Sequence, residues 1–235
     1  FNFRYLSAAW DAAAVKATID TEFHVLPTGT PATWVLSNHD VVRHRTRLGG
    51  LDRARAATLL MLALPGVCYL YTGEELGLPE ADVPPAAMQD PTWFRSNGSY
   101  SRDGARVPIP WSGGAAPYGF SPPATTTWLP QPADWAPLSV AAQTGREGST
   151  LELYRAALAL RRTEPAFTDN GFRWLPSPDG VLRFERGTAD CRLECWVNFS
   201  AAALPLPAAD VVLTSRSVEA TGLLSAETGV WLRPT

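Results

Sequence analysis

The chain has 235 residues, a formal net charge of -3 from 20 basic and 23 acidic side chains, and 46% hydrophobic residues. This length and apolar content allow one large or two modest globular domains, and the balanced charge argues against a dedicated nucleic-acid-binding protein. The longest apolar run, residues 59–67, is broken by Pro65 and is too short to cross a membrane. Cys68, Cys191 and Cys195 fit neither a disulfide framework nor a zinc pattern, so we expect reduced thiols and a cytoplasmic location.

The first 71 residues alternate between strand-like and helix-like segments. Residues 1–6 are short and aromatic, which is typical of a strand. Residues 12–23 predict a helix, because apolar side chains recur at helical spacing after Asp11, a residue suited to capping. Residues 33–37 are apolar without alternation, as in a parallel strand that is covered on both faces.

A second helix and strand follow the pair Gly49 and Gly50. One face of the predicted helix carries the apolar side chains of Ala54, Ala57, Met61 and Leu64. Residues 67–71 then predict another buried strand. Strands and helices that alternate with short turns indicate parallel α/β structure.

Residues 72–149 lack this regularity and are rich in Pro, Gly and aromatic residues. Because disordered segments are poor in aromatics, we expect an ordered excursion with short helical pieces. A helix resumes where Ser149 and Glu152 form a capping box, with Leu151, Tyr154 and Leu158 on one face, and it ends at Pro165.

An all-β tail follows, and we place a domain boundary near Glu164. Two strands surround residues 178–180, and residues 191–199 alternate, with Leu193, Cys195 and Val197 facing a core and the opposite side facing solvent. Residues 211–214 and 229–232 supply further strands.

The polar residues Asn38, His39 and Asp40 end the apolar segment 33–37 abruptly. In parallel α/β folds, ligands bind at the carboxyl ends of strands, so this cluster is in position to bind one. Asp40 could act as a base, a nucleophile, a hydroxyl acceptor or a metal ligand. A turn or helix cap explains Asn and Asp at a strand end equally well. No neighbouring residues complete a metal-ligand set, and we predict no metal and no cofactor.

Several segments resemble the α-amylase superfamily of glycoside hydrolases. The sequence "WVLSNHDVVRH" is similar to the fourth conserved region of that family, and "GVCYLYTGEELGLPE" is similar to its eighth barrel strand in α-glucosidases. The segment "MQDPTWFRSNGSYSRDGARVPIPW" is similar to the long loop after that strand in α-glucosidases and oligo-1,6-glucosidases. "FNFRYL" resembles the sixth strand, although Arg4 stands where an acidic residue is common. These matches occur in the family order.

The resemblance implies an α/β fold: the C-terminal part of a (β/α)8 TIM barrel from about strand six, followed by a small antiparallel β-sandwich domain. The domains would be residues 1–164, with the long loop 72–149 after strand eight, and residues 165–235. The resemblance also implies a retaining mechanism with two carboxyl groups roughly 5 Å apart. In the family these groups follow strands four and five, which have no counterpart in this sequence.

The resemblance implies roles for five residues. Asp40 matches the third essential carboxylate, which binds sugar hydroxyls and favours the distorted transition state, and His39 matches the neighbouring hydroxyl-binding histidine. Asn38, Arg43 and Arg102 would bind the substrate: Asn38 begins the same motif, and the two arginines match arginines that line the sugar pocket. A structural salt bridge is an equal alternative for both arginines.

Other candidates have weaker chemical reasons behind them. Glu74 and Glu75 are adjacent, and adjacent carboxylates diverge more often than they form a catalytic pair. Trp93, Trp111 and Trp128 could stack on sugar rings, but most loop tryptophans pack the loop.

We therefore expect a fragment of an α-glucosidase that acts on short oligosaccharides built from α-glucosides, inactive alone because it lacks the nucleophile and the acid/base. A transglycosylase of the sucrose isomerase or trehalose-forming type, and a non-catalytic truncated polypeptide, are the alternatives. The bond preference, calcium dependence and oligomeric state do not follow from the sequence. Half a barrel would leave an open sheet edge and should be unstable alone.

Overall fold

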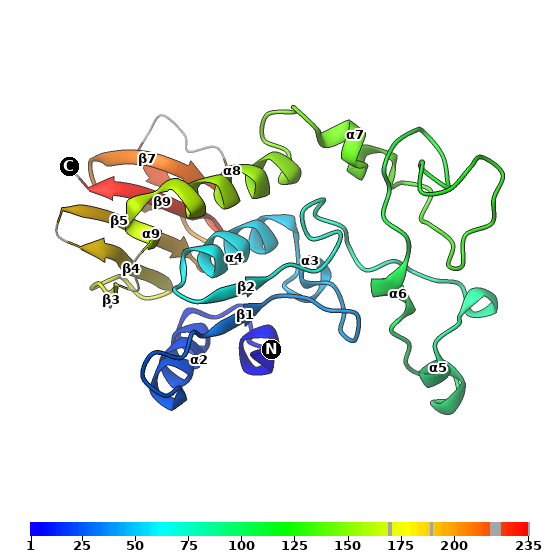
Figure 1. The fold of residues 1–235 in the computed structure, drawn as a ribbon, viewed down its shortest axis with the longest axis horizontal. Coiled ribbons are helices and arrows are strands. Elements are labelled where there is room, and N and C mark those ends of the chain that lie inside the picture. The colour runs from blue at the N-terminus through cyan, green and yellow to red at the C-terminus, as the bar shows by residue number, and fades with distance from the viewer. Residues whose placement is uncertain (169–170, 189, 217–221, 235) are drawn as a thin grey trace. The chain divides into compact units, whose positions relative to one another are not determined.

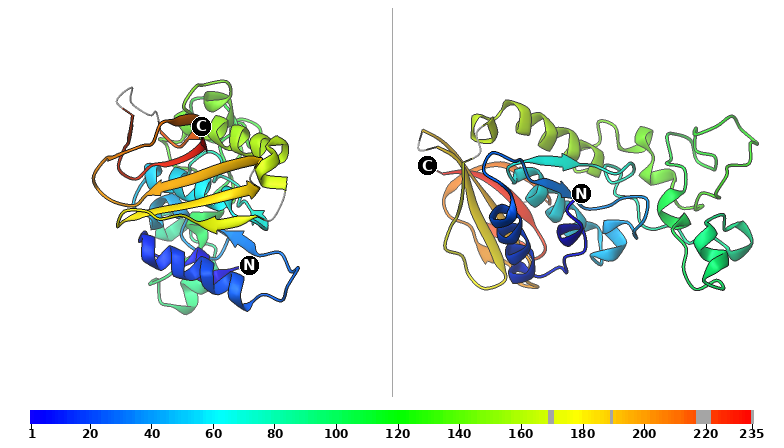
Figure 2. Two further views of the ribbon diagram at one scale, coloured as in Figure 1. Left: turned by 90° about the vertical axis from the view of Figure 1, so that its left-hand side faces the viewer. Right: turned by 60° about the horizontal axis from the view of Figure 1, so that its bottom comes forward.

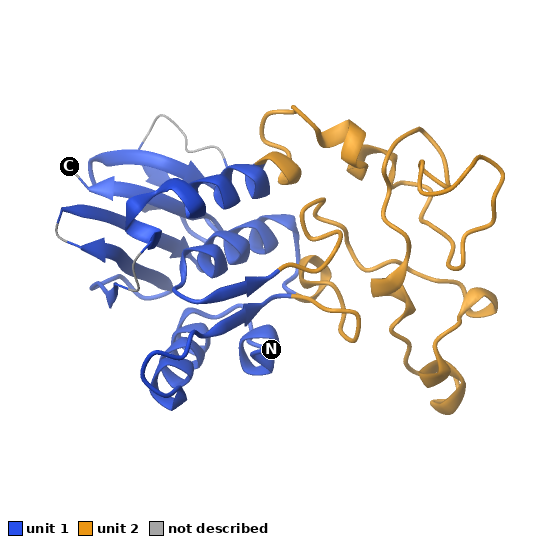
Figure 3. Cartoon of the chain, viewed as in Figure 1, with its two compact units in different colours: residues 1–36, 48–69, 153–235 blue, residues 37–47, 70–152 orange. Residues whose placement is uncertain are grey.

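The computed structural model describes residues 1–168, 171–188, 190–216 and 222–234 (Figure 1). The chain forms two compact units, which are described separately (Figure 3). Unit 1 contains residues 1–36, 48–69 and 153–235, and unit 2 contains residues 37–47 and 70–152.

Unit 1 holds most of the regular structure. Its helices are α1 (Phe3–Leu6), α2 (Ala12–Val25), α4 (Leu51–Ala63), the greater part of α8 (Thr150–Thr163) and α9 (Pro165–Thr168). Its strands are β1 (Thr33–Val35), β2 (Val67–Tyr69), β3 (Phe172–Trp174), β4 (Val181–Thr188), β5 (Cys191–Asn198), β6 (Leu204–Pro205), β7 (Ala209–Thr214), β8 (Leu223–Leu224) and β9 (Gly229–Pro234).

The predicted parallel pair is confirmed by β1 and β2, in which Trp34 lies opposite Cys68. Trp34 is fully buried, and its indole Nε1 donates to the carbonyl of Pro65 at 2.8 Å. The prediction that β2 is buried is wrong, because Val67 and Tyr69 are 44% and 46% exposed. Within the described residues β2 pairs only with β1, so one of its edges has no neighbouring strand.

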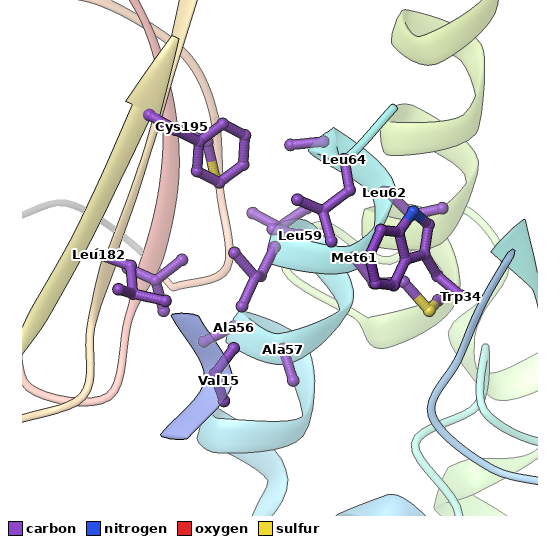
Figure 4. Packing of buried hydrophobic residues seen from close by; sticks show 14 of the residues in the cluster. Val15, Trp34, Ala56, Ala57, Leu59, Met61, Leu62, Leu64, Leu182 and Cys195 are labelled. Atoms are coloured by element: carbon purple, nitrogen blue, oxygen red, sulfur yellow. The ribbon is translucent and has the colours of Figure 1, made fainter. Parts of the chain in front are cut away.

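Helix α4 lies between β2 and the antiparallel strands, and both of its long sides are covered (Figure 4). Every residue from Ala56 to Ala63 is buried, which is more than the single apolar face that the sequence predicts. Apolar residues all round a helix are typical of one that is enclosed in a core. Trp231 of β9 reinforces the packing, because its indole donates to the carbonyl of Leu59 at 3.1 Å.

The C-terminal strands form a five-stranded antiparallel sheet in the order β3-β4-β5-β9-β7, as predicted for an all-β tail (Figure 2). The hairpin between β3 and β4 pairs Phe172 with Arg186 and Trp174 with Phe184. The short strands β6 and β8 pair separately. They share an apolar cluster with β4, β5 and β9, so the second face of the large sheet is also covered.

Strand β5 shows the predicted alternation with a different outcome on its second face. Leu193, Cys195 and Val197 belong to the main core as expected. The prediction that the opposite face meets solvent holds for Arg192, which is exposed, but it is wrong for Glu194 and Asn198, which are 7% and 0% exposed. The buried Glu194 carboxylate is satisfied by the Arg183 guanidinium at 2.9 Å and by the Trp196 indole at 2.7 Å.

The segment 1–6 contains helix α1 (Phe3–Leu6), so the predicted strand is wrong. The Asn2 side chain caps this helix by accepting a hydrogen bond from the Tyr5 amide at 2.9 Å. The amides of Leu6 and Ser7 bond to carbonyls four residues earlier. The backbone groups of this segment are hydrogen-bonded within the segment, and the Asn2 side chain caps the helix. The aromatic composition of the segment gave no sign of this cap.

Unit 2 is an ordered excursion with short helical pieces, as predicted. These are α3 (His44–Arg47), η1 (Pro85–Ala87), α5 (Pro91–Arg95), α6 (Asp103–Arg106), η2 (Ala136–Leu138) and α7 (Val140–Gln143), where η marks a 3-10 helix. An apolar cluster of its own includes Leu76, Val107, Tyr118 and Trp135.

The helix that follows unit 2 begins as predicted and differs on its predicted apolar face. The Ser149 hydroxyl caps α8 by accepting a hydrogen bond from the Glu152 amide at 3.2 Å. Leu151 and Tyr154 are buried as predicted, but Leu158 is 36% exposed, so its inclusion in that face is wrong.

Candidate active site

The predicted polar cluster lies on a loop of unit 2 that is closed at its base. The Ser37 hydroxyl accepts a hydrogen bond from the His44 amide at 2.9 Å and lies 3.1 Å from His44 Nδ1. Within this loop, Asn38 Oδ1 accepts a hydrogen bond from the Asp40 amide at 2.8 Å. Asn38 is buried and supports the turn, whereas His39 and Asp40 are exposed. Asn38 therefore takes part in a turn, while the side chains of His39 and Asp40 are accessible to a ligand.

The two oxygens of the Asp40 carboxylate have different surroundings. Oδ1 accepts from Arg102 Nη1 at 2.8 Å and from Arg106 Nη2 at 3.1 Å. Oδ2 lies 3.4 Å from His39 Nε2. The Arg106 Nε group also donates to the His39 carbonyl at 2.9 Å, and the Tyr100 hydroxyl donates to the Asp40 carbonyl at 3.1 Å. One oxygen is held by two guanidinium groups, and the other faces an imidazole on an exposed surface.

Arg102 joins the site to the interior of unit 2. Its Nε and Nη2 groups donate to the two oxygens of the buried Asp90 carboxylate, each at 2.8 Å. The Arg102 hydrogen bonds hold the pKa of Asp90 well below its usual range, and the Asp90 carboxylate raises the pKa of Arg102. Paired guanidinium and carboxylate groups of this kind have a fixed geometry. The salt-bridge interpretation of Arg102 is therefore correct for one side of its guanidinium group, while its Nη1 reaches Asp40.

Arg43 occupies a different place from the other four predicted residues. It is 1% exposed, and its guanidinium donates to the carbonyls of Thr72 and Ala105, each at 2.8 Å. Burial lowers the pKa of Arg43. Its backbone amide donates to the Glu80 carboxylate at 2.8 Å. Arg43 therefore ties the site loop to the segments that follow it, and it lines a cavity of about 430 Å³ together with Arg106.

Aromatic side chains line the same cavity. Trp111, Phe120 and Trp128 are 48%, 50% and 62% exposed, whereas Tyr118 and Trp135 are buried in the apolar cluster of unit 2. Exposed aromatic faces beside charged groups are suited to stacking on sugar rings. Trp93, the third tryptophan considered from the sequence, is partly buried beside Gly98.

Glu74 and Glu75 have separate environments. Glu74 is 2% exposed, and burial raises its pKa to about 8. Glu75 Oε2 accepts a hydrogen bond from the Gly73 amide at 2.8 Å. Burial and the nearby Arg47 and Arg43 lower the pKa of His44 to about 3. Glu74 and Glu75 therefore differ in burial, as expected for adjacent carboxylates that diverge, and His44 is a buried member of the loop 37–47.

The described parts of the chain contain neither a metal-binding cluster nor a membrane-spanning helix. No group of three His, Cys, Asp or Glu side chains there could hold a metal ion. None of the helices described is long and apolar enough to span a membrane.

A model of the α-amylase catalytic domain matches residues 2–170, which include the whole loop 37–47 and both arginines that bind Asp40. The chain belongs to the α-amylase family. A probable α-glucosidase of Rhizobium meliloti (strain 1021) is 35% identical over 190 residues, covering 78% of this chain and 34% of the relative. An α-glucosidase of Apis mellifera is 28% identical over 208 residues, covering 85% and 36%. The chain thus spans about a third of the length of these curated relatives.

Solved structures of α-amylase-family TIM-barrel enzymes are similar to this chain. The α-glucosyl transfer enzyme XgtA is 31% identical with a TM-score of 0.78, covering 96% of this chain and 44% of that chain. The trehalulose synthase MutB from Pseudomonas mesoacidophila MX-45 is 22% identical with a TM-score of 0.78, covering 94% and 46%, a likeness of fold alone.

Sequence reasoning found part of this candidate site and missed part of it. Asn38, His39, Asp40 and Arg102 come together in the structure, although they were chosen from two separate motifs. Arg106 and Asp90 were not chosen. Arg106 stands four residues after Arg102, one turn along the chain into α6, and this spacing is the signal that could have found it.

Proposed function

We propose that this chain is the C-terminal part of a retaining α-glucosidase that hydrolyses terminal α-glucosidic bonds of short oligosaccharides. The observation that carries the proposal is the Asp40 carboxylate, exposed and held by Arg102 and Arg106 in the segment matched by the family model. The names of the two curated relatives support the substrate class.

In this proposal Asp40 and His39 form hydrogen bonds with hydroxyl groups of the sugar whose glycosidic bond is cleaved. Hydrogen bonds to the sugar that strengthen as the ring distorts lower the barrier by several kcal/mol. Asn38 shapes the turn, while Arg43 and Arg102 line the pocket. The nucleophile and the acid/base come from a part of the barrel outside this chain. The chain then begins at about strand six, and its β-domain begins near residue 165.

The first prediction is that Asp40→Asn in the complete enzyme abolishes most of the hydrolysis of an aryl α-glucoside. The amide keeps the shape of the side chain but removes the negative charge that stabilises the positive charge of the transition state. We expect kcat/KM to fall by about a hundredfold or more. Asp82→Asn, at an exposed acid of unit 2, is the matched control and should leave the rate unchanged. Activity of Asp40→Asn within tenfold of the wild type would contradict the role of Asp40.

A transglycosylase is the second candidate, and the 31% identity with the α-glucosyl transfer enzyme XgtA supports it. The two reactions share an intermediate and differ in whether water or a sugar hydroxyl resolves it. Product analysis on sucrose and maltose separates them. An excess of rearranged disaccharide over free glucose would favour transfer, and an excess of glucose would favour hydrolysis.

The third candidate is a polypeptide that has no activity by itself. This candidate is a non-catalytic truncated polypeptide, and the purified chain then does not hydrolyse an aryl α-glucoside. A cooperative thermal transition together with hydrolysis by this chain alone would exclude this candidate. We also propose a cytoplasmic location, which is supported by three cysteines that fit no disulfide framework and which cell fractionation would test.

A further inference from the structure

Arg102 shares one guanidinium group between two carboxylates of unlike exposure. Asp90 is fully buried and engages Nε and Nη2 of Arg102, whereas the Asp40 side chain is 48% exposed and engages only Nη1. Two of the three guanidinium nitrogens of Arg102 therefore donate to one buried carboxylate, that of Asp90. The third is directed to the side chain that the proposed function places against the sugar.

Asp90 is itself held in place from several directions. Its amide donates to Asp103 Oδ2 at 2.9 Å, and its Oδ1 accepts from the Thr92 amide at 2.9 Å. Its Oδ2 also accepts from the Arg102 amide at 2.8 Å. Because the carboxylate is fixed by the backbone on both sides of the loop, the arginine that it binds has little freedom to move.

We propose that Asp90 is a positioning residue for the reaction, acting on Asp40 through Arg102. It has two effects on that arginine. The paired hydrogen bonds fix the direction of Nη1, which holds Asp40 Oδ1 while Oδ2 stays open beside His39. The Asp90 charge also offsets the charge of Arg102, one of the two guanidinium groups on Asp40 Oδ1, which weakens the hold of that group and eases the exchange of partners with sugar hydroxyls. This inference rests on the proposed function.

The test is Asp90→Asn in the complete enzyme. Asparagine keeps the size of the side chain but replaces one charged acceptor with an amide donor, which opposes the Arg102 donors. We expect kcat per active molecule to fall by about tenfold to a hundredfold, the scale of a small displacement of a catalytic group. KM should change less, because Asp40 acts mainly in the transition state. Loss of folded protein alone would lower the number of active molecules and leave kcat per active molecule unchanged.

A double-substitution cycle shows whether the effect passes through Asp40. If it does, Asp40→Asn with Asp90→Asn is no slower than Asp40→Asn alone. Multiplication of the two losses would overturn the positioning role, and so would Asp90→Asn with wild-type kcat per active molecule. Asp82→Asn is the control, and Asp90→Ala serves as a second variant if Asp90→Asn does not fold. Full activity of Asp40→Asn would instead overturn the proposed function, so the two failures are distinguishable.

Discussion

At the scale of single residues, two buried groups, Glu74 and His44, have pKa values that are shifted in opposite directions. Burial raises the pKa of Glu74 from 4.5 to about 8, and it lowers the pKa of His44 from 6.5 to about 3. The folded protein therefore keeps both groups neutral over most of the ordinary pH range. Each group favours the folded state only where the unfolded chain also holds it neutral.

The second prediction follows from the signs of these shifts. The stabilising contribution of Glu74 is complete below pH 4.5 and is lost as pH rises to about 8, while that of His44 is complete above pH 6.5 and is lost as pH falls to about 3. Between pH 4.5 and 6.5 the two slopes cancel. Above pH 6.5 the free energy of unfolding should fall by about 1.4 kcal/mol per pH unit from Glu74.

Urea unfolding at pH values from 5 to 8 measures this effect by comparison with Glu74→Gln. The glutamine variant lacks the Glu74 contribution, which falls from pH 4.5 upward. The free energy of unfolding of the variant relative to that of the wild type should therefore rise with pH over this range. Glu75→Gln is the control, because Glu75 is only partly buried. Parallel stability curves for the wild type and Glu74→Gln would show that Glu74 is ionised in the folded protein.

Some residues of the candidate site could be predicted from the sequence and others could not. Asn38, His39 and Asp40 could be found because they interrupt an apolar strand at the end where parallel α/β folds bind ligands. Asp90 could not be found in this way. Its partner Arg102 lies 12 residues away and reaches Asp40 over 62 residues, and only the folded chain brings those three side chains together.

At the scale of secondary-structure elements, helix caps were predicted more reliably than the burial of each element, although the segment 1–6 was wrongly predicted as a strand. Asp11 caps α2 by accepting from the Ala14 amide at 2.8 Å, as the sequence predicted. The burial of α4 on all sides, and of the second face of β5, depends on which elements pack against them. Neither the helical period nor the strand alternation contains that information.

The turn between α4 and β2 gives the third prediction. Gly66 has φ of +117°, and a Cβ there would lie well inside contact distance of the Ala32 carbonyl oxygen. That carbonyl accepts a hydrogen bond from the Val67 amide, which starts the pairing of β1 with β2. Gly66→Ala should therefore lower the free energy of unfolding by several kcal/mol or prevent folding, as expected for backbone strain combined with a backbone clash.

Gly29→Ala is the matched control for this substitution. Gly29 has φ of +83°, but a Cβ there would meet no atom within 4 Å. Gly29→Ala should lower the free energy of unfolding by only about 1–2 kcal/mol, the energy of a left-handed conformation in a residue with a side chain. Equal losses for the two variants in urea unfolding would mean that the contact with Ala32 is unimportant.

At the scale of the whole molecule, unit 1 exposes apolar side chains on and beside its parallel strands. Phe1, Phe3, Val67 and Tyr69 are 44–60% exposed, and the rings of Phe1 and Tyr69 are 4.9 Å apart. Parallel sheets in α/β proteins are normally covered on both faces. A cluster of exposed apolar side chains on one unit is typical of a surface that another polypeptide segment covers.

The fourth prediction is that the remaining part of the family barrel covers this surface. Co-expression of this chain with the preceding portion of the complete enzyme should give a soluble complex that hydrolyses an aryl α-glucoside. The chain expressed alone should aggregate or melt at a lower temperature. Tyr69→Lys should weaken the complex, and Leu158→Lys, an exposed substitution on α8, is the control. Equal solubility of the chain with and without its partner would contradict this prediction.

The hydrogen bond between Ser37 and His44 also has a consequence for how the site loop assembles during folding. The His44 amide closes a span of 7 residues to Ser37, and the neighbouring Arg43 amide closes a span of 37 residues to Glu80. The longer closure costs about 1.5 kcal/mol more chain entropy, since this cost grows with the logarithm of the span. In pulse-labelled refolding, the His44 amide should gain protection from hydrogen exchange before the Arg43 amide, so the loop closes on itself before the rest of unit 2 fixes its orientation.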